Sequence, residues 1–468
     1  MIVIGAMIGS GIFIVPATMA RVIQSPGWLL VAWLLTGMLT LVAAISYGEL
    51  SSALPEGGGM YRYLSVAFSP MCGFLYGWTF FTVIQTGSIA AVAVAFSRFT
   101  GILVPWISES HYIVKPIRFA SHYAISVSTT QLLAISIVAI LTLTNWLGLR
   151  YGRWVQNAFT VTKLGALAGL IVLGVVFGAN RAAIHDNVTA IFQFHGISFP
   201  SDIGASLFSP LIAVCVSQSG SLFSADSWHN VAFASEEIRD PRRVLPRALI
   251  FGSAMVVVIY LITNVVYLAN LTFSDIETAP GNLVATAMLQ RIFPNYGNTL
   301  MAVAIMISTF GCINSLVLAG ARAYFTMARD GLFLPSAGRL NRAHVPGRSL
   351  ILQAIWAILL ITLTTYSPQS GYGNLYSDLL DYVISAALFF YILAIAGVIV
   401  LRRKRPDLER PYRAWGYPIT PIVHIVGASS ILVCLAFYRP ATTWPGFAIV
   451  AFGVPVYFLF RRRVPATA

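Results

Sequence analysis

Long apolar runs alternate with short polar segments along this chain. A helix that crosses a membrane needs about 20 consecutive apolar residues, and twelve of the runs are long enough. They cover residues 2–22, 28–53, 66–100, 131–149, 154–178, 203–230, 245–270, 297–325, 348–366, 377–401, 418–438 and 443–460. The pattern predicts an all-α polytopic membrane protein with twelve transmembrane helices.

Composition and charge agree with this prediction and add an orientation. Hydrophobic residues make up 57% of the 468 residues and charged residues only 10%, which is too apolar for a soluble protein. The net charge of +13 comes from basic residues in the connections. Every second connection, taken together with the C-terminal tail, carries roughly three times as many basic residues as the others. The positive-inside rule therefore predicts two cytoplasmic termini, and the net charge needs no nucleic-acid partner.

The four cysteines, Cys72, Cys215, Cys312 and Cys434, all lie within apolar runs. Their spacing fits neither a disulfide framework nor a metal site, and we expect no cofactor. The first run lacks the basic n-region and the small-residue cleavage site of a signal peptide. Because that run begins at Met1 itself, we expect that residues upstream of it are missing.

The first run is interrupted by Gly9-Ser10-Gly11 and again by Pro16. Glycine weakens a helix, and proline removes a backbone donor. In lipid, unwound backbone survives only where it lines a cavity or binds something. Small residues also allow neighbouring helices to pack closely, so this motif alone does not decide between a binding site and a packing site.

A second interrupted helix favours a binding site. The sixth run contains Ser217-Gln218-Ser219-Gly220-Ser221, followed by the polar stretch from Phe223 to His229. Five spans separate it from the first interrupted helix, and an odd number of spans inverts the second copy of a repeat. Matched interrupted helices are the best sequence pointer to the central site of a transporter. We therefore expect inverted repeats at 1–178 and 202–401, with 402–468 outside them.

Short motifs follow one another in order along nearly the whole chain. They are GSGIF at 9–13, PEGGG at 55–59, Gln156-Asn157 with Lys163, FSADSW at 223–228, Glu236-Glu237, Asp240-Pro241, Ala328-Arg329-Asp330-Gly331 and Arg410-Pro411-Tyr412-Arg413. Together these motifs resemble the amino acid–polyamine–organocation (APC) superfamily, and within it the L-type amino acid transporter branch.

The resemblance implies a sodium-independent amino acid transporter with a leucine-transporter-like fold. That fold has five plus five inverted spans with broken helices 1 and 6, here followed by two extra helices. The substrate-binding residues that it implies are Met7, Gly9, Ser10, Gly11, Phe223 and Asp226.

The resemblance also implies a role for most of these residues. Backbone N–H groups at Ser10 and Gly11 would hold the substrate carboxylate, which agrees with the preference of a helix N-terminus for anions. Carbonyls near Met7, Phe223 and Asp226 would take the ammonium, as the free carbonyls of a helix C-terminus can. Phe223 would act as an aromatic gate.

Segment 101–130 indicates whether the protein could be disulfide-linked to a partner protein. Animal members of the branch carry a cysteine before the fourth span that bonds a partner glycoprotein, whereas this segment has none. We therefore expect no disulfide-linked heavy chain, and the sequence looks prokaryotic, which places it in the bacterial inner membrane. The same segment is mixed in composition, and we expect a short interfacial helix there.

Ionisable residues inside a membrane are functional candidates by default. Lys163 falls near the middle of the fifth run, too deep to snorkel, and we expect it to have a coupling or core-organising role. In the family pattern it lies between spans 1, 5 and 8. Asp226 faces the substrate ammonium or bonds free backbone N–H groups. His229 is more often a packed histidine than a proton carrier, and Glu49 is a solvated or paired end residue.

Other classes of function fit less well. No HExxH or GxSxG motif indicates an intramembrane enzyme. A receptor that binds an amino acid without moving it would not need two matched broken helices. Among transporters, exchange and proton symport both stay open, and we favour exchange, in which Lys163 keeps its proton throughout. The small residues Ser224 and Ala225 do not decide which amino acids are carried.

Overall fold

The computed structural model describes residues 1–118, 123–148, 152–193, 209–367, 371–372 and 375–461. The side chain of Gln156 and residues 203–208 of the sixth run lie outside this part of the chain. The helices are α1 (Ile2–Met7), α2 (Gly11–Ile23), α3 (Pro26–Ala53), α4 (Gly59–Ala67), α5 (Pro70–Thr79), α6 (Gln85–Leu103), α7 (Thr129–Trp146), α8 (Gly152–Phe177), α9 (Arg181–Thr189), α10 (Ser209–Ser224), α11 (Pro241–Asn270), α12 (Phe273–Glu277), α13 (Val284–Ile292), α14 (Gly297–Arg329), α15 (Gly347–Thr362), α16 (Leu375–Lys404), α17 (Ile419–Tyr438) and α18 (Pro440–Arg461).

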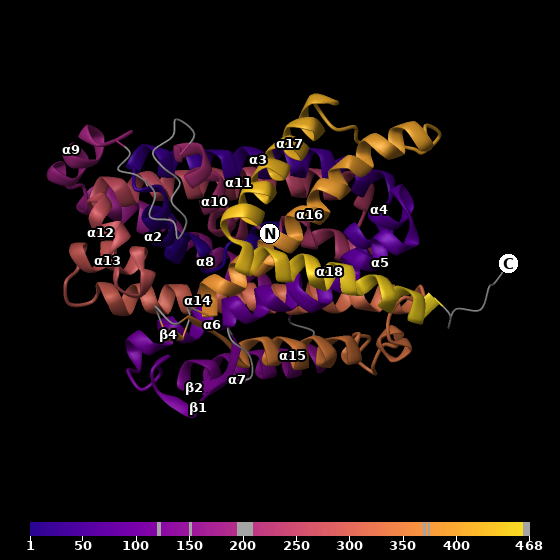
Figure 1. The fold of residues 1–468 in the computed structure, drawn as a ribbon, viewed down its shortest axis with the longest axis horizontal. Helices are drawn as coiled ribbons and strands as arrows, with labels where there is room; N and C mark the ends of the chain where they lie inside the picture. Colours follow the sequence, from indigo (N-terminus) through magenta and orange to yellow (C-terminus); the bar gives the residue numbers. More distant parts are fainter. Residues whose placement is uncertain (119–122, 149–151, 194–208, 368–370, 373–374, 462–468) are drawn as a thin grey trace.

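Each predicted run contains a helix, and the helices form one bundle (Figure 1). The first run is divided into α1 and α2. The third forms a single 34-residue span in which α5 and α6 are joined through a π-helical turn at Phe80–Ile84. Among the described residues, nine helices are long and apolar enough to cross a membrane, and α2 and α15 are shorter apolar helices. The prediction of a polytopic helical membrane protein is confirmed.

Proline and serine set the starts of several helices. Pro26, Pro70 and Pro241 occupy the first turns of α3, α5 and α11, where the missing N–H leaves no hydrogen bond unmade. At α7 the Ser128 hydroxyl accepts from the N–H of Gln131, and the Gln131 side chain accepts from the N–H of Ser128. These caps fix helix starts close to the starts of the apolar runs.

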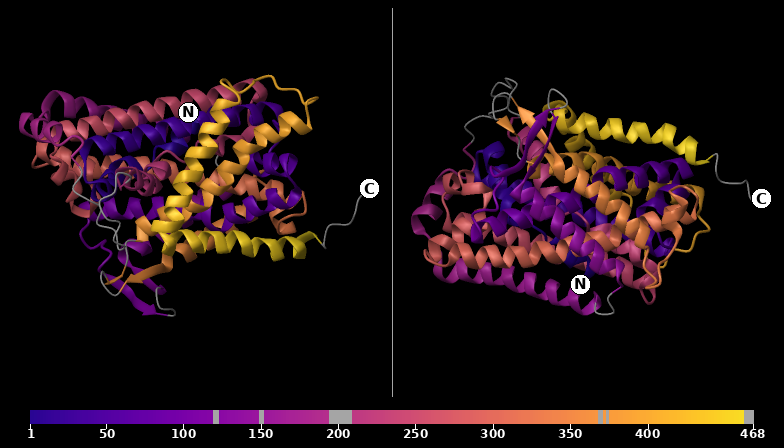
Figure 2. Two further views of the ribbon diagram at one scale, coloured as in Figure 1. Left: turned by 45° about the horizontal axis from the view of Figure 1, so that its top comes forward. Right: turned by 90° about the horizontal axis from the view of Figure 1, so that it is seen from below.

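The prediction of a short interfacial helix in segment 101–130 is wrong, because residues 112–118 and 123–128 form strands. Strands β1 (Tyr112–Arg118) and β2 (Tyr123–Ser128) pair antiparallel, and β2 pairs with β3 (Leu363–Ser367), which pairs with β4 (Gly371–Tyr372). The sheet has the order β1-β2-β3-β4 and projects from one end of the bundle (Figure 2). Its tertiary pairing with the end of the ninth run is not visible in the local sequence.

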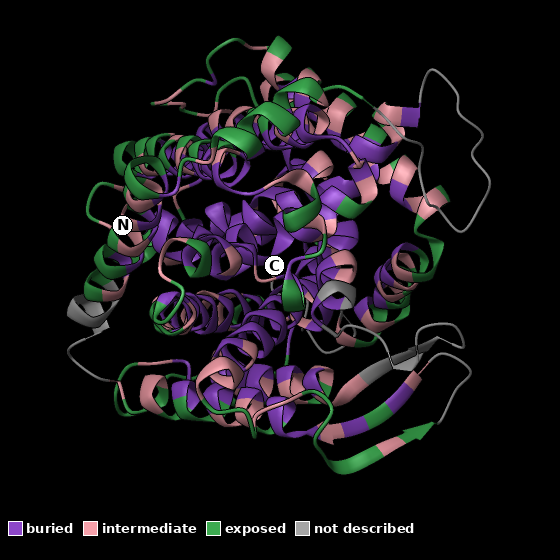
Figure 3. Ribbon diagram, turned by 90° about the vertical axis from the view of Figure 1, so that its left-hand side faces the viewer, coloured by how far each residue is buried: buried purple, intermediate pink, exposed green. Residues whose placement is uncertain are grey.

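The protein interior is centred on α6. In the most apolar window of the α5–α6 span 94% of residues are buried inside the protein, against 28% for α8, α17 and α18. Large side chains on outer helices, such as Val176, Phe251 and Phe437, are exposed. Figure 3 shows buried residues gathered in the middle and exposed ones on the outside. An apolar exterior of this extent is the surface that lipid covers.

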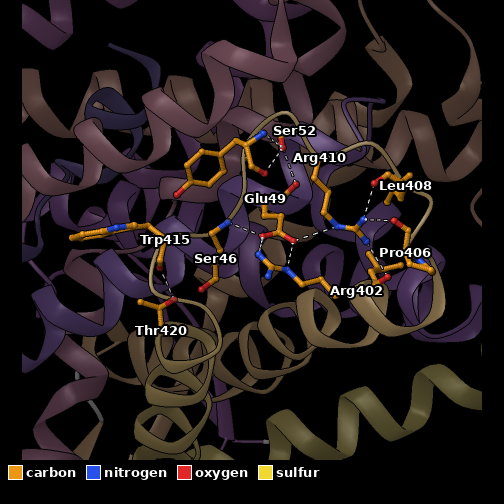
Figure 4. Close-up of polar contacts among 12 residues, drawn as sticks. Ser46, Glu49, Ser52, Arg402, Pro406, Leu408, Arg410, Trp415 and Thr420 are labelled. Carbon is orange, nitrogen blue, oxygen red and sulfur yellow. Dashed lines mark hydrogen bonds and ion pairs between the residues drawn. The ribbon is translucent and has the colours of Figure 1, made fainter.

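Glu49, near the end of α3, is buried and paired rather than solvated. Its carboxylate accepts two bonds from Arg402, from Nε at 2.8 Å and from the terminal nitrogen at 2.6 Å. It also accepts the backbone N–H of Ala414 at 2.7 Å, and Arg410 Nε lies 3.4 Å away (Figure 4). The Arg402 guanidinium in turn stacks 3.7 Å from the ring centre of Tyr417. One carboxylate therefore joins α3 to α16 and to the segment before α17.

We expect Glu49→Gln to destabilise the protein by about 3 kcal/mol or more, because it leaves two arginines of a buried cluster without their anion. The matched control is Glu56→Gln, whose pair with Arg62 is exposed and contributes no more than about 1 kcal/mol. Thermal denaturation of the purified protein in detergent measures both. Equal effects of the two substitutions would contradict the role given to the buried cluster.

The orientation can be tested with two exposed aspartates. Asp186 lies on α9, and Asp407 lies in the connection after α16. In a background without the native cysteines, Asp186→Cys should react with an impermeant thiol reagent in intact cells. Asp407→Cys should react only after the cells are permeabilised, because we expect its connection to be cytoplasmic. The reverse labelling pattern would refute two cytoplasmic termini.

Candidate functional site

Two helices are interrupted in the middle of the bundle. Between α1 and α2, residues 8–10 leave the helix, and Ile8 is extended with φ −77° and ψ 98°. Between α10 and a 3-10 helix at Trp228–Glu237, residues 225–227 are unwound, and Ser227 is left-handed with φ 67°. Both predicted breaks are confirmed. The second prediction also included residues 217–221 in the interruption, which is wrong, because these residues are helical and belong to α10.

The two breaks approach each other so closely that only glycine fits at position 11. A Cβ on Gly11 would lie 2.8 Å from the Cα of Ser224, which is closer than two carbon atoms approach without a bond. The Tyr260 hydroxyl contacts both breaks, at 3.2 Å from the Met7 carbonyl oxygen and 3.1 Å from that of Ser224. The breaks therefore form one structural unit.

A cavity lies where the breaks meet. It is lined by Ala6, Met7, Gly9, Ser10, Gly11, Ser88, Val92, Phe223, Ser224, Asp226, Ser227, Cys312 and Leu316. The structure thus brings all six expected substrate-binding residues to one cavity. Lys163 is not part of its lining.

Side chains donate to carbonyl oxygens at the end of α1 and in the first break. Lys163 donates to Gly5 (2.6 Å) and Ile8 (2.9 Å), Cys312 to Ala6 (3.3 Å) and Ser308 to Gly9 (3.3 Å), while the single proton of Tyr260 is shared between Met7 (3.2 Å) and Ser224 (3.1 Å). The donors come from α8, α11 and α14. At the other end of the break, α2 begins at Gly11, and its first N–H groups have no partner within the helix.

Lys163 is almost completely buried at 1% exposure, in agreement with its expected depth. Both of its hydrogen bonds go to carbonyls of the first break, which ties α8 to that segment. The third helix of the expected group, α14, reaches the same segment through Cys312 and Ser308. Lys163 therefore organises the backbone next to the cavity rather than forming its wall.

Aromatic rings close one side of the cavity. The Ser10 hydroxyl lies 3.0 Å from the Tyr376 hydroxyl, and the ring centres of Phe223 and Tyr376 are 6.3 Å apart in an edge-to-face arrangement. The Arg98 guanidinium lies 5.7 Å from the Tyr376 ring centre and pairs with Glu109 at 2.7 Å. Phe223, the expected gate, is itself only 8% exposed.

Asp226 lines the cavity and bonds other groups as well. Its carboxylate accepts from the Tyr391 hydroxyl and from the backbone N–H of Ser227. No ion pair joins it to a cation among the residues that the structure describes. Its neighbour His229 is buried and lies within hydrogen-bonding distance of two tyrosines. In the described part of the chain, no group of three or more candidate metal ligands occurs.

Sequence reasoning missed four side chains of the site: Tyr260, Cys312, Tyr376 and Tyr391. Each contacts a residue of a break, yet each lies in an apolar helix far away in the sequence. Tyrosine in the middle of such a helix is a usable signal, because its buried hydroxyl needs a partner.

Comparisons with known proteins identify the family of the chain. A sequence model described as "Amino acid permease" matches residues 1–460. The chain is 31% identical over 465 residues to the human large neutral amino acids transporter small subunit 2, covering 98% of this chain and 78% of the relative. It is 28% identical over 466 residues to the serine/threonine exchanger SteT of Bacillus subtilis, covering 99% and 95%.

A further relative is the b(0,+)-type amino acid transporter 1 of Mus musculus, which is 29% identical over 466 residues, covering 98% of this chain and 86% of the relative. The matches extend over almost the whole chain, including both helix breaks and the helices that pack against them. The chain therefore belongs to the amino acid permease family of the APC superfamily and resembles its L-type branch.

Proposed function

We propose that this protein exchanges amino acids across the cell membrane without sodium, by alternating access to the cavity between the two helix breaks. The observation that carries the proposal is the meeting of two broken helices at one buried cavity, with a glycine where they touch. Unwound backbone at this depth needs a cavity or a ligand. The name of the Bacillus relative, a serine/threonine exchanger, supports exchange.

The substrate carboxylate binds the N-terminus of α2 at Ser10 and Gly11. Protein side chains donate hydrogen bonds to the carbonyls of residues 5–9, whereas the first N–H groups of α2 have no i−4 partner within the helix. A helix N-terminus favours an anion through its N–H groups and its dipole. The ammonium lies on the opposite side, towards the Phe223 carbonyl and the Asp226 carboxylate.

Lys163 replaces a metal cation. Its ammonium holds two carbonyls of the first break, Gly5 and Ile8, at the position where a bound ion would otherwise stabilise unwound backbone. A fixed charge of this kind makes sodium unnecessary. If Lys163 keeps its proton through the cycle, the protein exchanges amino acids; if Lys163 releases the proton in one conformation, the protein becomes a proton symporter, which is the second candidate function.

The remaining assignments follow from the same proposal. The inverted repeats comprise residues 1–178 and 202–401, and residues 402–468 add two helices and a tail. The termini are cytoplasmic, the membrane is the bacterial inner membrane, and no disulfide-linked heavy chain is required. The cysteine-free segment 101–130 supports the last point.

The carboxylate site predicts that Gly11→Ala lowers transport by roughly 100-fold, the order of loss that a displacement of about 1 Å produces. The added Cβ would separate the two breaks. The control is Gly165→Ala on α8, where an added Cβ meets open space. Counterflow of L-leucine, L-serine and L-arginine in proteoliposomes measures both variants.

In the same assay, L-leucine methyl ester should compete far less well than L-leucine, since it lacks the anion. Esters that compete as well as free acids would refute the helix-end site. Insertion of Gly11→Ala into the membrane at wild-type levels would separate a binding defect from a folding defect.

The role of Lys163 predicts that Lys163→Ala severely impairs counterflow, while replacing sodium by choline leaves the wild type unchanged. Vesicles without internal amino acid then separate the two candidate functions. Exchange predicts little uptake into them, with or without an inward proton gradient. Strong gradient-driven uptake into empty vesicles would overturn exchange in favour of proton symport, and sodium-dependent uptake would overturn both.

A further inference from the structure

Four buried side chains form an unbroken hydrogen-bonded chain that leads away from the cavity. The Asp226 carboxylate accepts from the Tyr391 hydroxyl, which lies 3.2 Å from His229 Nδ1. On the other side of the imidazole, Nε2 lies 3.4 Å from the Tyr76 hydroxyl. The four residues come from the second helix break (Asp226), the 3-10 helix that follows it (His229), α16 (Tyr391) and α5 (Tyr76), and each is buried. These hydrogen bonds connect the cavity at Asp226 to Tyr76 on α5.

The donors of this chain all point the same way. A tyrosine has a single hydroxyl proton, and that of Tyr391 goes to Asp226. The Tyr391 oxygen must therefore accept from His229, so Nδ1 carries the proton of the neutral ring. Nε2 is then an acceptor and takes the hydroxyl proton of Tyr76. The direction of donation runs from Tyr76 through His229 and Tyr391 to Asp226.

Tyr76, at the far end of this hydrogen-bonded chain, lies on α5, which packs against α4, and it interacts electrostatically with Tyr324 on α14. The hydroxyls of Tyr63 on α4 and Tyr324 on α14 are buried and have no hydrogen-bond partner among the described residues. Unpaired buried hydroxyls of this kind are the usual partners of internal water. On the same helix as Tyr63, Tyr61 donates to Asp330, the exposed residue that follows α14, at 2.9 Å. Helix α4 next to α5 therefore carries one hydroxyl inside the bundle and one beside an exposed carboxylate.

The surroundings of Asp226 leave its charge without a fixed counterion. The titratable groups that face Asp226 and His229 from the elements around them are Tyr47 on α3, Tyr76 on α5, Cys312 on α14, Tyr391 on α16 and His424 on α17. None of these is a permanent cation, and the hydrogen bonds of Lys163 go to Gly5 and Ile8. A buried carboxylate without a cation is costly, and a proton relieves that cost.

We propose that Asp226 is a proton-binding site that is loaded from the α4 face through Tyr76, His229 and Tyr391. One proton moves at each bond. Tyr76 gives its hydroxyl proton to His229 Nε2, Nδ1 gives its proton to Tyr391, and Tyr391 gives its own to the Asp226 carboxylate. Water at the α4 side returns a proton to Tyr76. No net charge is left on the three relay residues, and the bonds now point in the opposite direction, ready for the reverse transfer.

This proton site rests on the proposed function only in treating the adjacent cavity as the place where the substrate ammonium enters. With the cavity empty, Asp226 holds the proton. With an ammonium in the cavity, the ionised carboxylate pairs with it, and the proton leaves through the relay rather than past the substrate. Binding and proton release thereby use separate routes.

The test needs no transport substrate, so its result is independent of whether the protein is an exchanger. The full chain is reconstituted in liposomes, and the carbonyl band of protonated carboxylic acid is followed by time-resolved infrared spectroscopy after a downward pH jump. We expect the wild type to show this band from the protonated Asp226 carboxyl group, and we expect the band to be missing in Asp226→Asn. His229→Asn should reach the same final amplitude at a rate at least roughly tenfold slower, because proton transfer through the ring is lost.

Two further variants separate a relay from a packing effect. Tyr76→Phe preserves the ring and should also slow the band at least roughly tenfold. His424→Asn is the matched control. His424 is a buried histidine that lines a second cavity together with Asp226, but it is not part of the hydrogen-bonded chain from Tyr76 to Asp226. Its variant should therefore keep the wild-type rate. A band that persists in Asp226→Asn, or no loss of rate in His229→Asn and Tyr76→Phe, would overturn the proposal, as would equal slowing in His424→Asn.

Discussion

Backbone polar groups inside a membrane must find partners within the protein, and the site depends on how this requirement is met at the first helix break. Five successive carbonyls, from residue 5 to residue 9, each accept a side-chain hydrogen bond from α8, α11 or α14. The opposite end of the same break is the N-terminus of α2, whose first N–H groups have no i−4 partner within the helix. In the proposed function, this end of the break is where the substrate carboxylate binds.

How much of this was readable in the sequence differs from element to element. The glycines at 9 and 11 and the polar stretch after Phe223 are local signals, because only special backbone needs them. The partners of these segments are not local: Tyr260, Cys312 and Tyr391 reach the breaks from the apolar middle parts of distant helices. Strands β1 and β2, at 112–118 and 123–128, were missed for the same reason, since the pairing of β2 with β3 is a tertiary contact.

Helix α16 links three regions that have separate roles. Tyr376 at its start contacts Ser10 beside the cavity, Tyr391 bonds Asp226, and Arg402 at its end binds Glu49. At 1.5 Å per residue these positions span roughly 40 Å along one axis. A displacement of α16 would therefore act on the aromatic closure, the relay and the buried ion cluster together. This geometry makes α16 the natural element to couple the two ends of the cavity during alternating access.

The charges around the cavity match a zwitterion in orientation. Positive character comes from the N-terminus of α2 at Gly11, and negative character comes from Asp226, while the ammonium of Lys163 is used up on carbonyls outside the lining. In the proposed function, an amino acid would be held by its backbone atoms in one direction. The apolar parts of the wall come from Val92 of α6 and Leu316 of α14, and also from Met7 and Phe223 of the broken helices. Both pairs of helices therefore offer apolar contacts to a substrate side chain.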